Sequence, residues 1–204
     1  MKISFLASHG GTATRQIYQA IEVGELGASL GVVITNNRDS EIYDWCCEHA
    51  LSVHHISGRT HPDDDEKDLA ILKVLDDAGT DLVVLSGYMK KIGWRTLSQY
   101  QERILNIHPS LLPRHGGRGM YGDHVHYSVL RSGDSESGAT VHLIDEEYDE
   151  GPVIAQRKVP VGPDDNLESL KAKVQALEGP LYIEAISSIM RKKKAPPSVR
   201  RSVR

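Results

Sequence analysis

The N-terminal half of the sequence alternates short apolar runs with segments of helical periodicity. The apolar runs are residues 3–7, 30–35, 52–56 and 81–86. The last of these is almost continuously apolar, as is typical of a central parallel strand. Because strands that alternate with helices favour a parallel sheet, we expect an α/β fold with a doubly wound, mostly parallel, Rossmann-like sheet flanked by helices.

Length and composition set the scale of this fold. The chain has 204 residues, of which 39% are hydrophobic, and its formal net charge is −4. We expect one domain over residues 1–190 and a basic, disordered tail over residues 191–204. A slightly acidic chain gives no reason to expect nucleic acid, so small molecules are the expected partners. The sequence leaves open whether the protein is a monomer or a homodimer.

The cysteines and the N-terminus bear on the compartment. Cys46 and Cys47 are the only cysteines. They are adjacent in a predicted helix, where a bridge between them would be strained, so we expect reduced thiols. The apolar run at residues 3–7 is too short for a signal peptide or a membrane span. We therefore expect a cytoplasmic protein without membrane contact.

The segment 104–113, with the sequence ILNIHPSLLP, contains the main candidate site. Pro109 cannot donate a hydrogen bond to a sheet, which predicts that the apolar strand ends at His108. Asn106 and His108 are two residues apart and share one face of this strand. Ligands bind at the carboxyl edge of open α/β sheets. An amide beside an imidazole there can stabilise an oxyanion and move protons, as acyl transfer requires.

Three loops contain further candidates. The glycine turn at residues 8–14 opens a helix and can offer backbone N–H groups to an anion, although a tight turn without a ligand explains it equally well. The glycine-rich loop 114–122 carries Arg114 and Arg118, which are available to an anion. The acidic loop 145–152 can supply a carboxylate to His108, or it can be a solvated turn.

Histidine pairs invite a metal site, but their spacing argues against one. His54 and His55 are adjacent in a predicted strand and face opposite sides. His124 and His126 are two apart in a predicted helix and point in different directions. We therefore predict no metal site.

Three motifs together carry a family resemblance. They are NIHPSLLP at residues 106–113, DEGPVI at residues 149–154 and GYM at residues 87–89. With them the chain resembles the folate-dependent formyltransferases, most of all those that formylate glycinamide ribonucleotide, from residue 1 to about residue 190. The resemblance implies 10-formyltetrahydrofolate as co-substrate, an amine as acceptor and no metal.

The resemblance also implies roles for individual residues. Asn106 and a cationic His108 would stabilise the oxyanion, while Asp149 would favour that cation and help to remove a proton. The expected folate-binding residues are Met89, Lys90, Lys91, Ile92, Asp145, Glu146 and Tyr148. The expected acceptor-binding residues are Gly11, Thr12 and Ala13, at the position of the family's phosphate turn, and Glu178, near the acceptor amine.

Two departures keep the acceptor open. Ala13 replaces an amide in the phosphate turn, and Asp64 stands where the family places an arginine, with Arg59 nearby as a substitute. An alternative acceptor is therefore another primary amine, such as an amino sugar or a natural-product precursor. A formyltetrahydrofolate hydrolase or a methionyl-tRNA formyltransferase is not expected, because each carries an additional domain. A non-catalytic nucleotide-binding module is a further alternative.

Overall fold

The structure, a computed structural model, describes residues 1–145 and 147–194. Within these residues one sheet has the strand order β3-β2-β1-β4-β5-β6-β7. Its strands are β1 (Lys2–Ala7), β2 (Ser29–Thr35), β3 (Val53–His55), β4 (Leu82–Ser86), β5 (Ile104–His108), β6 (Glu136–Leu143) and β7 (Val153–Pro160). The helices are α1 (Thr12–Glu22), α2 (Glu41–Glu48), α3 (Asp64–Asp77), α4 (Trp94–Gln99), α5 (Asp123–Ser132) and α6 (Leu167–Lys194).

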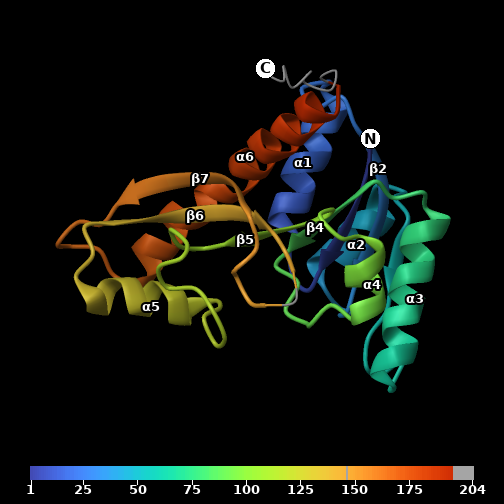
Figure 1. The fold of residues 1–204 in the computed structure, drawn as a ribbon, viewed down its shortest axis with the longest axis horizontal. Coiled ribbons are helices and arrows are strands. Elements are labelled where there is room, and N and C mark those ends of the chain that lie inside the picture. Colours follow the sequence, from blue (N-terminus) through green and yellow to red (C-terminus); the bar gives the residue numbers. More distant parts are fainter. Residues whose placement is uncertain (146, 195–204) are drawn as a thin grey trace, which may run out of the picture.

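The sheet is parallel from β3 to β5 and antiparallel beyond it. The predicted α/β class with a mostly parallel sheet is therefore confirmed. Figure 1 shows β6, β7 and α5 at one end of the molecule, and β2, α2 and α3 at the other. The strand β5 lies where the two pairing modes meet, with β4 parallel on one side and β6 antiparallel on the other.

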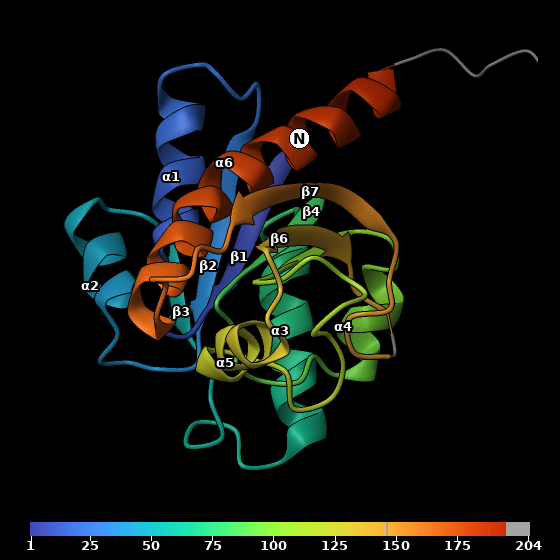
Figure 2. The same cartoon turned by 90° about the vertical axis from the view of Figure 1, so that its left-hand side faces the viewer.

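Two apolar cores lie on opposite faces of the sheet. Phe5 of β1 belongs to the core under α1, α2 and α6, whereas the next residue, Leu6, belongs to the core under α3 and α4. Figure 2 shows α1 and α6 on one side of the strands and α3 and α4 on the other. Burying a side chain of this size contributes roughly 1.5–3 kcal/mol, so a strand buried on both faces anchors the fold.

Two helix starts follow the chemistry of their first residues. The Asp63 side chain accepts a hydrogen bond from the Glu66 backbone N–H at the start of α3. At the start of α6, the Ser169 N–H donates to Asn166 Oδ1 at 3.0 Å. Such caps satisfy N–H groups that have no partner within the helix.

The helix α6 passes the predicted domain boundary at residue 190 and continues to Lys194. The remainder of the predicted tail, residues 195–204, lies outside the described residues. In the described part of the chain, no helix combines the length and the apolar character that a membrane crossing requires.

Candidate active site

A cavity of about 610 Å³ lies beside the carboxyl ends of β4 and β5. Its walls are the segment 87–92, the loop 117–122, residues 144, 145 and 147–149, and one side of α6. This volume falls within the range of small-molecule sites, roughly 300–1,000 Å³. The cavity occupies the sheet edge where an open α/β fold is expected to bind its ligand.

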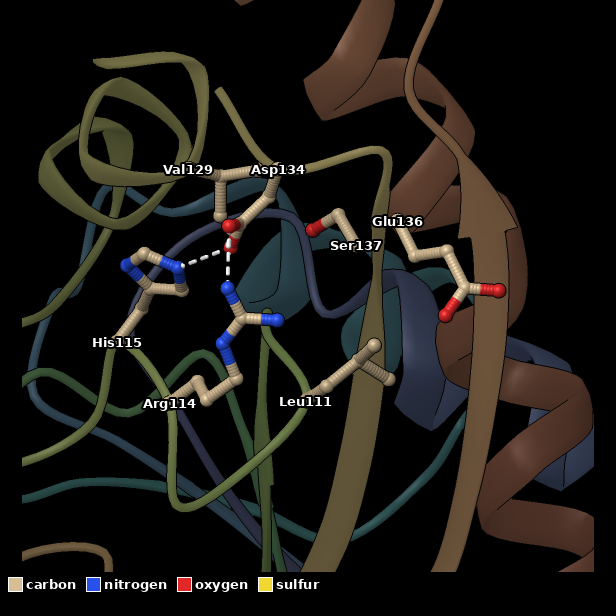
Figure 3. Close-up of a pocket in the computed structure, with 7 residues that line it drawn as sticks. All are labelled: Leu111, Arg114, His115, Val129, Asp134, Glu136 and Ser137. Atoms are coloured by element: carbon tan, nitrogen blue, oxygen red, sulfur yellow. Dashed lines mark hydrogen bonds and ion pairs between the residues drawn. The ribbon is translucent and has the colours of Figure 1, made fainter. Parts of the chain in front are cut away.

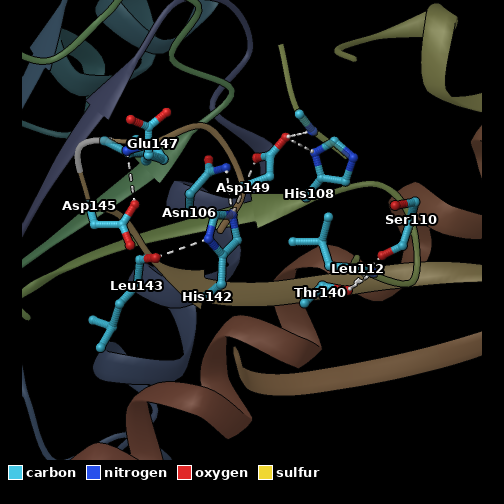
Figure 4. A network of polar contacts seen from close by, with 12 residues as sticks. Asn106, His108, Ser110, Leu112, Thr140, His142, Leu143, Asp145, Glu147 and Asp149 are labelled. Atoms are coloured by element: carbon cyan, nitrogen blue, oxygen red, sulfur yellow. Dashed lines mark hydrogen bonds and ion pairs between the residues drawn. The ribbon is translucent and has the colours of Figure 1, made fainter. Parts of the chain in front are cut away.

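The cavity brings together the three residues predicted to be catalytic. Asn106, His108 and Asp149 all line it. His108 is 3% exposed, and its Nδ1 lies 3.4 Å from Asp149 Oδ2. Figure 4 shows Asp149, from the loop between β6 and β7, beside the His108 ring. An amide, an imidazole and a carboxylate therefore face one space, although they come from segments more than 40 residues apart.

The turn after His108 is held on the sheet by Thr140 of β6. The Thr140 hydroxyl donates to the Ser110 carbonyl at 2.6 Å and accepts from the Leu112 N–H at 3.1 Å. The hydroxyl contacts both residues in Figure 4. Thr140 and Ser110 are fully buried, so these bonds are shielded from competing water. They fix where β5 ends and thereby where the His108 side chain is presented.

His142 orients the Asn106 amide, a role that the sequence did not reveal. The Asn106 amide donates to His142 Nε2 at 3.2 Å, and His142 Nδ1 donates to the Leu143 carbonyl at 3.0 Å. Both bonds require a neutral His142 with its proton on Nδ1. Burial lowers the pKa of His142, against the opposing effect of the Asp149 carboxylate. The antiparallel register pairs Asn106 with His142, so only the strand pairing could have shown this contact.

The backbone at the start of the glycine-rich loop 114–122 contacts His108 and Asp149, the other two candidate catalytic residues. His108 Nε2 donates to the His115 carbonyl at 2.8 Å. The Gly117 N–H donates to Asp149 Oδ2 at 2.9 Å. Arg118 lines the cavity, as its expected role requires, whereas the Arg114 guanidinium pairs with Asp134. The Arg114 side chain is 59% exposed, so its availability to an anion stays a prediction.

A cluster formed by Arg114, His115 and Asp134 holds this loop. In Figure 3 the side chains of His115 and Arg114 both point at Asp134. His115 Nε2 lies 2.8 Å from Asp134 Oδ2, and His115 Nδ1 lies 2.8 Å from Ser128 Oγ on α5. The hydrogen bond from His115 and the nearby Arg114 hold the pKa of Asp134 below its usual range. The cluster therefore connects the loop to α5 and to the start of β6.

The predicted folate-binding residues lie in two walls of the cavity. The lining residues from this set are Met89, Lys90, Lys91, Ile92, Asp145 and Tyr148. Glu146 lies outside the described residues. Met89 is 48% exposed and Tyr148 is 54% exposed, so both offer free apolar surface at the cavity. The Met89 N–H donates to Ser8 Oγ at 2.9 Å, which connects the first wall to the end of β1.

The predicted acceptor-binding residues fall into two groups. Gly11, Thr12 and Ala13 are not among the residues that line the cavity, whereas Glu178 of α6 is. Gly11 precedes α1 with a left-handed backbone, and Ala13 is 3% exposed in the core. Burial raises the pKa of Glu178 to about 7, so its carboxyl group can change charge near neutral pH.

The departure at Asp64 and the histidine pairs have local explanations. Asp64 is exposed in the first turn of α3 and pairs with Lys67. Carboxylates are favoured at a helix N-terminus, so the position of Asp64 in the fold needs no ligand.

Among the described residues, no group of three or more His, Cys, Asp or Glu side chains is placed to hold a metal ion. His126 is buried and lines the cavity, whereas His124 is exposed.

Comparisons with known proteins agree with this geometry. The model of the formyl transferase family matches residues 1–186. A chloroplastic phosphoribosylglycinamide formyltransferase from Arabidopsis thaliana is 35% identical over 92% of this chain, which spans 65% of that relative's length. The phosphoribosylglycinamide formyltransferase of Escherichia coli is 32% identical, with 92% of this chain and 86% of that protein covered.

A solved structure gives the same result for the fold. The crystal structure of phosphoribosylglycinamide formyltransferase from Bacillus halodurans has a TM-score of 0.86 and 31% sequence identity to this chain. The match covers 95% of this chain and 97% of the other. Family model, sequence relatives and fold therefore agree, and the chain belongs to the formyl transferase family.

Proposed function

We propose that the protein transfers the formyl group of 10-formyltetrahydrofolate to the amine of glycinamide ribonucleotide, a step of de novo purine synthesis. The observation that carries this proposal is the convergence of Asn106, His108 and Asp149 in one cavity. The names of the relatives, phosphoribosylglycinamide formyltransferase in plants and bacteria, support the choice of acceptor.

The reaction needs an oxyanion site and a path for protons. The acceptor nitrogen attacks the formyl carbon and forms a C–N bond, while the carbonyl oxygen becomes an oxyanion. The Asn106 amide and an N–H of His108 donate hydrogen bonds to this oxyanion. Asp149 accepts the proton lost by the attacking nitrogen, directly or through water. Collapse of the intermediate breaks the bond to N10 of the folate, which takes up a proton.

The proposed folate site lies between two walls of the cavity. Met89, Lys90, Lys91 and Ile92 would contact one side of the ring system, and the segment from Asp145 to Tyr148, including Glu146, the other. The exposed surfaces of Met89 and Tyr148 support this arrangement, because flat ligands bind against apolar side chains with few polar groups. The proposed chemistry uses no metal.

The proposed acceptor site combines Glu178 with the turn at Gly11, Thr12 and Ala13. Glu178 lines the cavity, and a carboxyl group that ionises near neutral pH suits contact with an amine. The turn would bind the phosphate through backbone N–H groups at the start of α1.

A second candidate is transfer to another primary amine, such as an amino sugar or a natural-product precursor. One observation favours it: Gly11, Thr12 and Ala13 are not among the residues that line the cavity. An acceptor without a phosphate would not need that turn. The oxyanion chemistry of Asn106, His108 and Asp149 would be the same.

Release of tetrahydrofolate from 10-formyltetrahydrofolate tests both candidates. The purified protein is assayed alone, with glycinamide ribonucleotide, and with the corresponding riboside, which has the same amine and no phosphate. Release that depends on the ribonucleotide supports the purine assignment, and the ratio between ribonucleotide and riboside measures the phosphate contacts. Equal slow release under all three conditions overturns this acceptor and directs the search to other amines.

The setting proposed for this reaction is the cytoplasm. Both cysteines, Cys46 and Cys47, are free, which supports a reducing compartment. The proposed partners are folate and the small-molecule acceptor, without nucleic acid or membrane, and the active unit is a monomer or a homodimer.

A further inference from the structure

We propose that His115 is a positioning residue that determines which ring nitrogen of His108 faces the reacting centre. The inference rests on the proposed function for its kinetic test, but its structural content is independent of the acceptor. Its basis is the path of residues 114–117, which contact both His108 and Asp149 through backbone groups.

The two ring nitrogens of His108 have different partners. Nε2 lies 2.8 Å from the His115 carbonyl, which can only accept a hydrogen bond, so this nitrogen carries a proton. Nδ1 is then the nitrogen that remains for Asp149, at 3.4 Å, and for a substrate oxygen. In the cationic form of His108, Nδ1 carries a proton as well; because 3.4 Å is long for a hydrogen bond to Asp149, that N–H remains able to donate to an oxyanion when substrate binds.

The carbonyl that accepts from His108 Nε2 belongs to His115, a residue with an unusual backbone. His115 has a left-handed backbone, with φ of 55°, which is uncommon for a residue other than glycine. Such strain persists where surrounding contacts impose it, and it gathers at functional sites. Here the imidazole of His115 is held at both nitrogens, by Ser128 and by Asp134 at 2.8 Å each.

The contact between the side chains of His115 and Asp134 is largely buried. The side chains of His115 and Asp134 are each 11% exposed, so their contact is shielded from solvent far more than a surface ion pair. Ser128 belongs to α5, and Asp134 lies between α5 and β6. The side chain of His115 therefore fixes its own carbonyl relative to α5. That carbonyl in turn fixes the orientation of the His108 ring.

Two substitutions of His115 separate this role from a purely structural one. His115→Phe keeps a ring of similar size and removes both anchors. His115→Gly also removes the anchors but accepts the left-handed backbone without strain. If the anchors position His108, both variants lose turnover by about tenfold or more, with the KM for folate unchanged within about twofold. Asp134→Asn, which keeps a hydrogen-bonding group, is expected to lose less.

His54→Phe is the matched control. His54 is exposed on β3, at the opposite edge of the sheet from β6 and β7, and the same substitution there should leave turnover unchanged.

A spectroscopic measurement tests the proposal without any substrate. Nitrogen NMR of protein labelled in its histidines reports which ring nitrogen is protonated, and the His108 signals are assigned by their loss in His108→Gln. The parent protein should show a protonated, hydrogen-bonded Nε2, and both His115 variants should show that signal moved or averaged. Unchanged His108 signals in both variants overturn the proposal. If the parent catalyses no formyl transfer, the proposed function fails, and the spectra still decide the role of His115.

Discussion

Two glycine-rich loops of this protein look alike in sequence and differ in what they do in the fold. The turn at residues 8–14 packs against the core, where a Cβ on Gly11 would lie 2.5 Å from the Ile42 side chain. The loop at residues 114–122 leaves the core and reaches the candidate catalytic residues, with Gly117 N–H donating to Asp149. Gly11 in the first loop serves close packing, whereas the Gly117 N–H in the second loop contacts a candidate catalytic carboxylate.

The difference shows that glycine content alone does not tell which requirement a glycine meets. A Cβ on Gly11 would meet an apolar side chain of α2, whereas nothing lies within 4 Å of a Cβ at Gly117, where the backbone φ of 94° is what favours glycine. Substitutions in the first loop should therefore act on stability, and substitutions around the second on turnover. Asp149→Asn and Gly11→Ala test this division, and Gly119→Ala separates backbone strain from packing. A further measurement, on Glu178→Gln, concerns a cavity residue outside both loops.

The largest effect is expected from Asp149→Asn. The amide oxygen can still accept from the Gly117 N–H, so the loop should stay in place, but the carboxylate that we propose as the proton acceptor is lost. We expect turnover to fall about 1,000-fold with little change in melting temperature. Steady-state kinetics and thermal unfolding of the same preparation check this. Loss of fold together with activity would mean that Asp149 is mainly a structural residue.

The next effect is expected from Gly11→Ala. The new methyl group would meet Ile42, and the backbone at φ of 61° disfavours any side chain. Overpacking and backbone strain together should lower the free energy of unfolding by about 3 to 4 kcal/mol. Denaturant unfolding measures this loss. A change below about 1 kcal/mol would show that the first loop can move as freely as the second.

Glu178→Gln should raise the free energy of unfolding above neutral pH. Burial raises the pKa of Glu178 from 4.5 to about 7 in the folded state. The folded protein therefore holds a proton that the unfolded chain releases, so stability falls as pH rises from about 4.5 to about 7. At about pH 8 the substitution should add about 2 to 3 kcal/mol, and below about pH 4 nothing. Unfolding curves at both pH values check the sign, and an equal gain at both would rule out ionisation as the cause.

The smallest effect is expected from Gly119→Ala in the second loop. Gly119 also has a left-handed backbone, with φ of 88°, but nothing lies within 4 Å of the position of a new Cβ. Only the backbone preference is lost, so we expect a destabilisation of about 1 kcal/mol. The destabilisation of Gly119→Ala reports backbone strain alone, whereas that of Gly11→Ala reports backbone strain together with overpacking. Measuring the free energy of unfolding of both variants separates the two contributions. Equal losses would show that packing against Ile42 contributes nothing.

A large part of the fold follows from local sequence patterns. Pro109 cannot donate to a sheet, and β5 ends at His108 as expected. Asp63 caps α3 and Asn166 caps α6, as the residue types at those positions predict. These features depend on hydrogen bonding and periodicity over a few residues, which the sequence displays directly.

The candidate site is only partly local. The pattern Asn-x-His places Asn106 and His108 on one face of a strand, and the sequence displays that spacing. The contacts that orient them come from elsewhere: His142 orients the amide, and the carbonyl of His115 orients the imidazole. Neither residue stands out in the sequence except as one of ten histidines.

The sequence by itself therefore determined the class of fold, the end of β5, the starts of α3 and α6, and the chemical groups available for catalysis. The tertiary structure alone decided which glycine loop reaches those groups and which nitrogen of His108 faces Asp149. The physical reason is that strand pairing and loop path bring together residues far apart in the chain, such as Asn106 and His142, which are 36 positions apart. Hydrogen bonds of this kind depend on distance in space, and short-range sequence patterns carry no record of it.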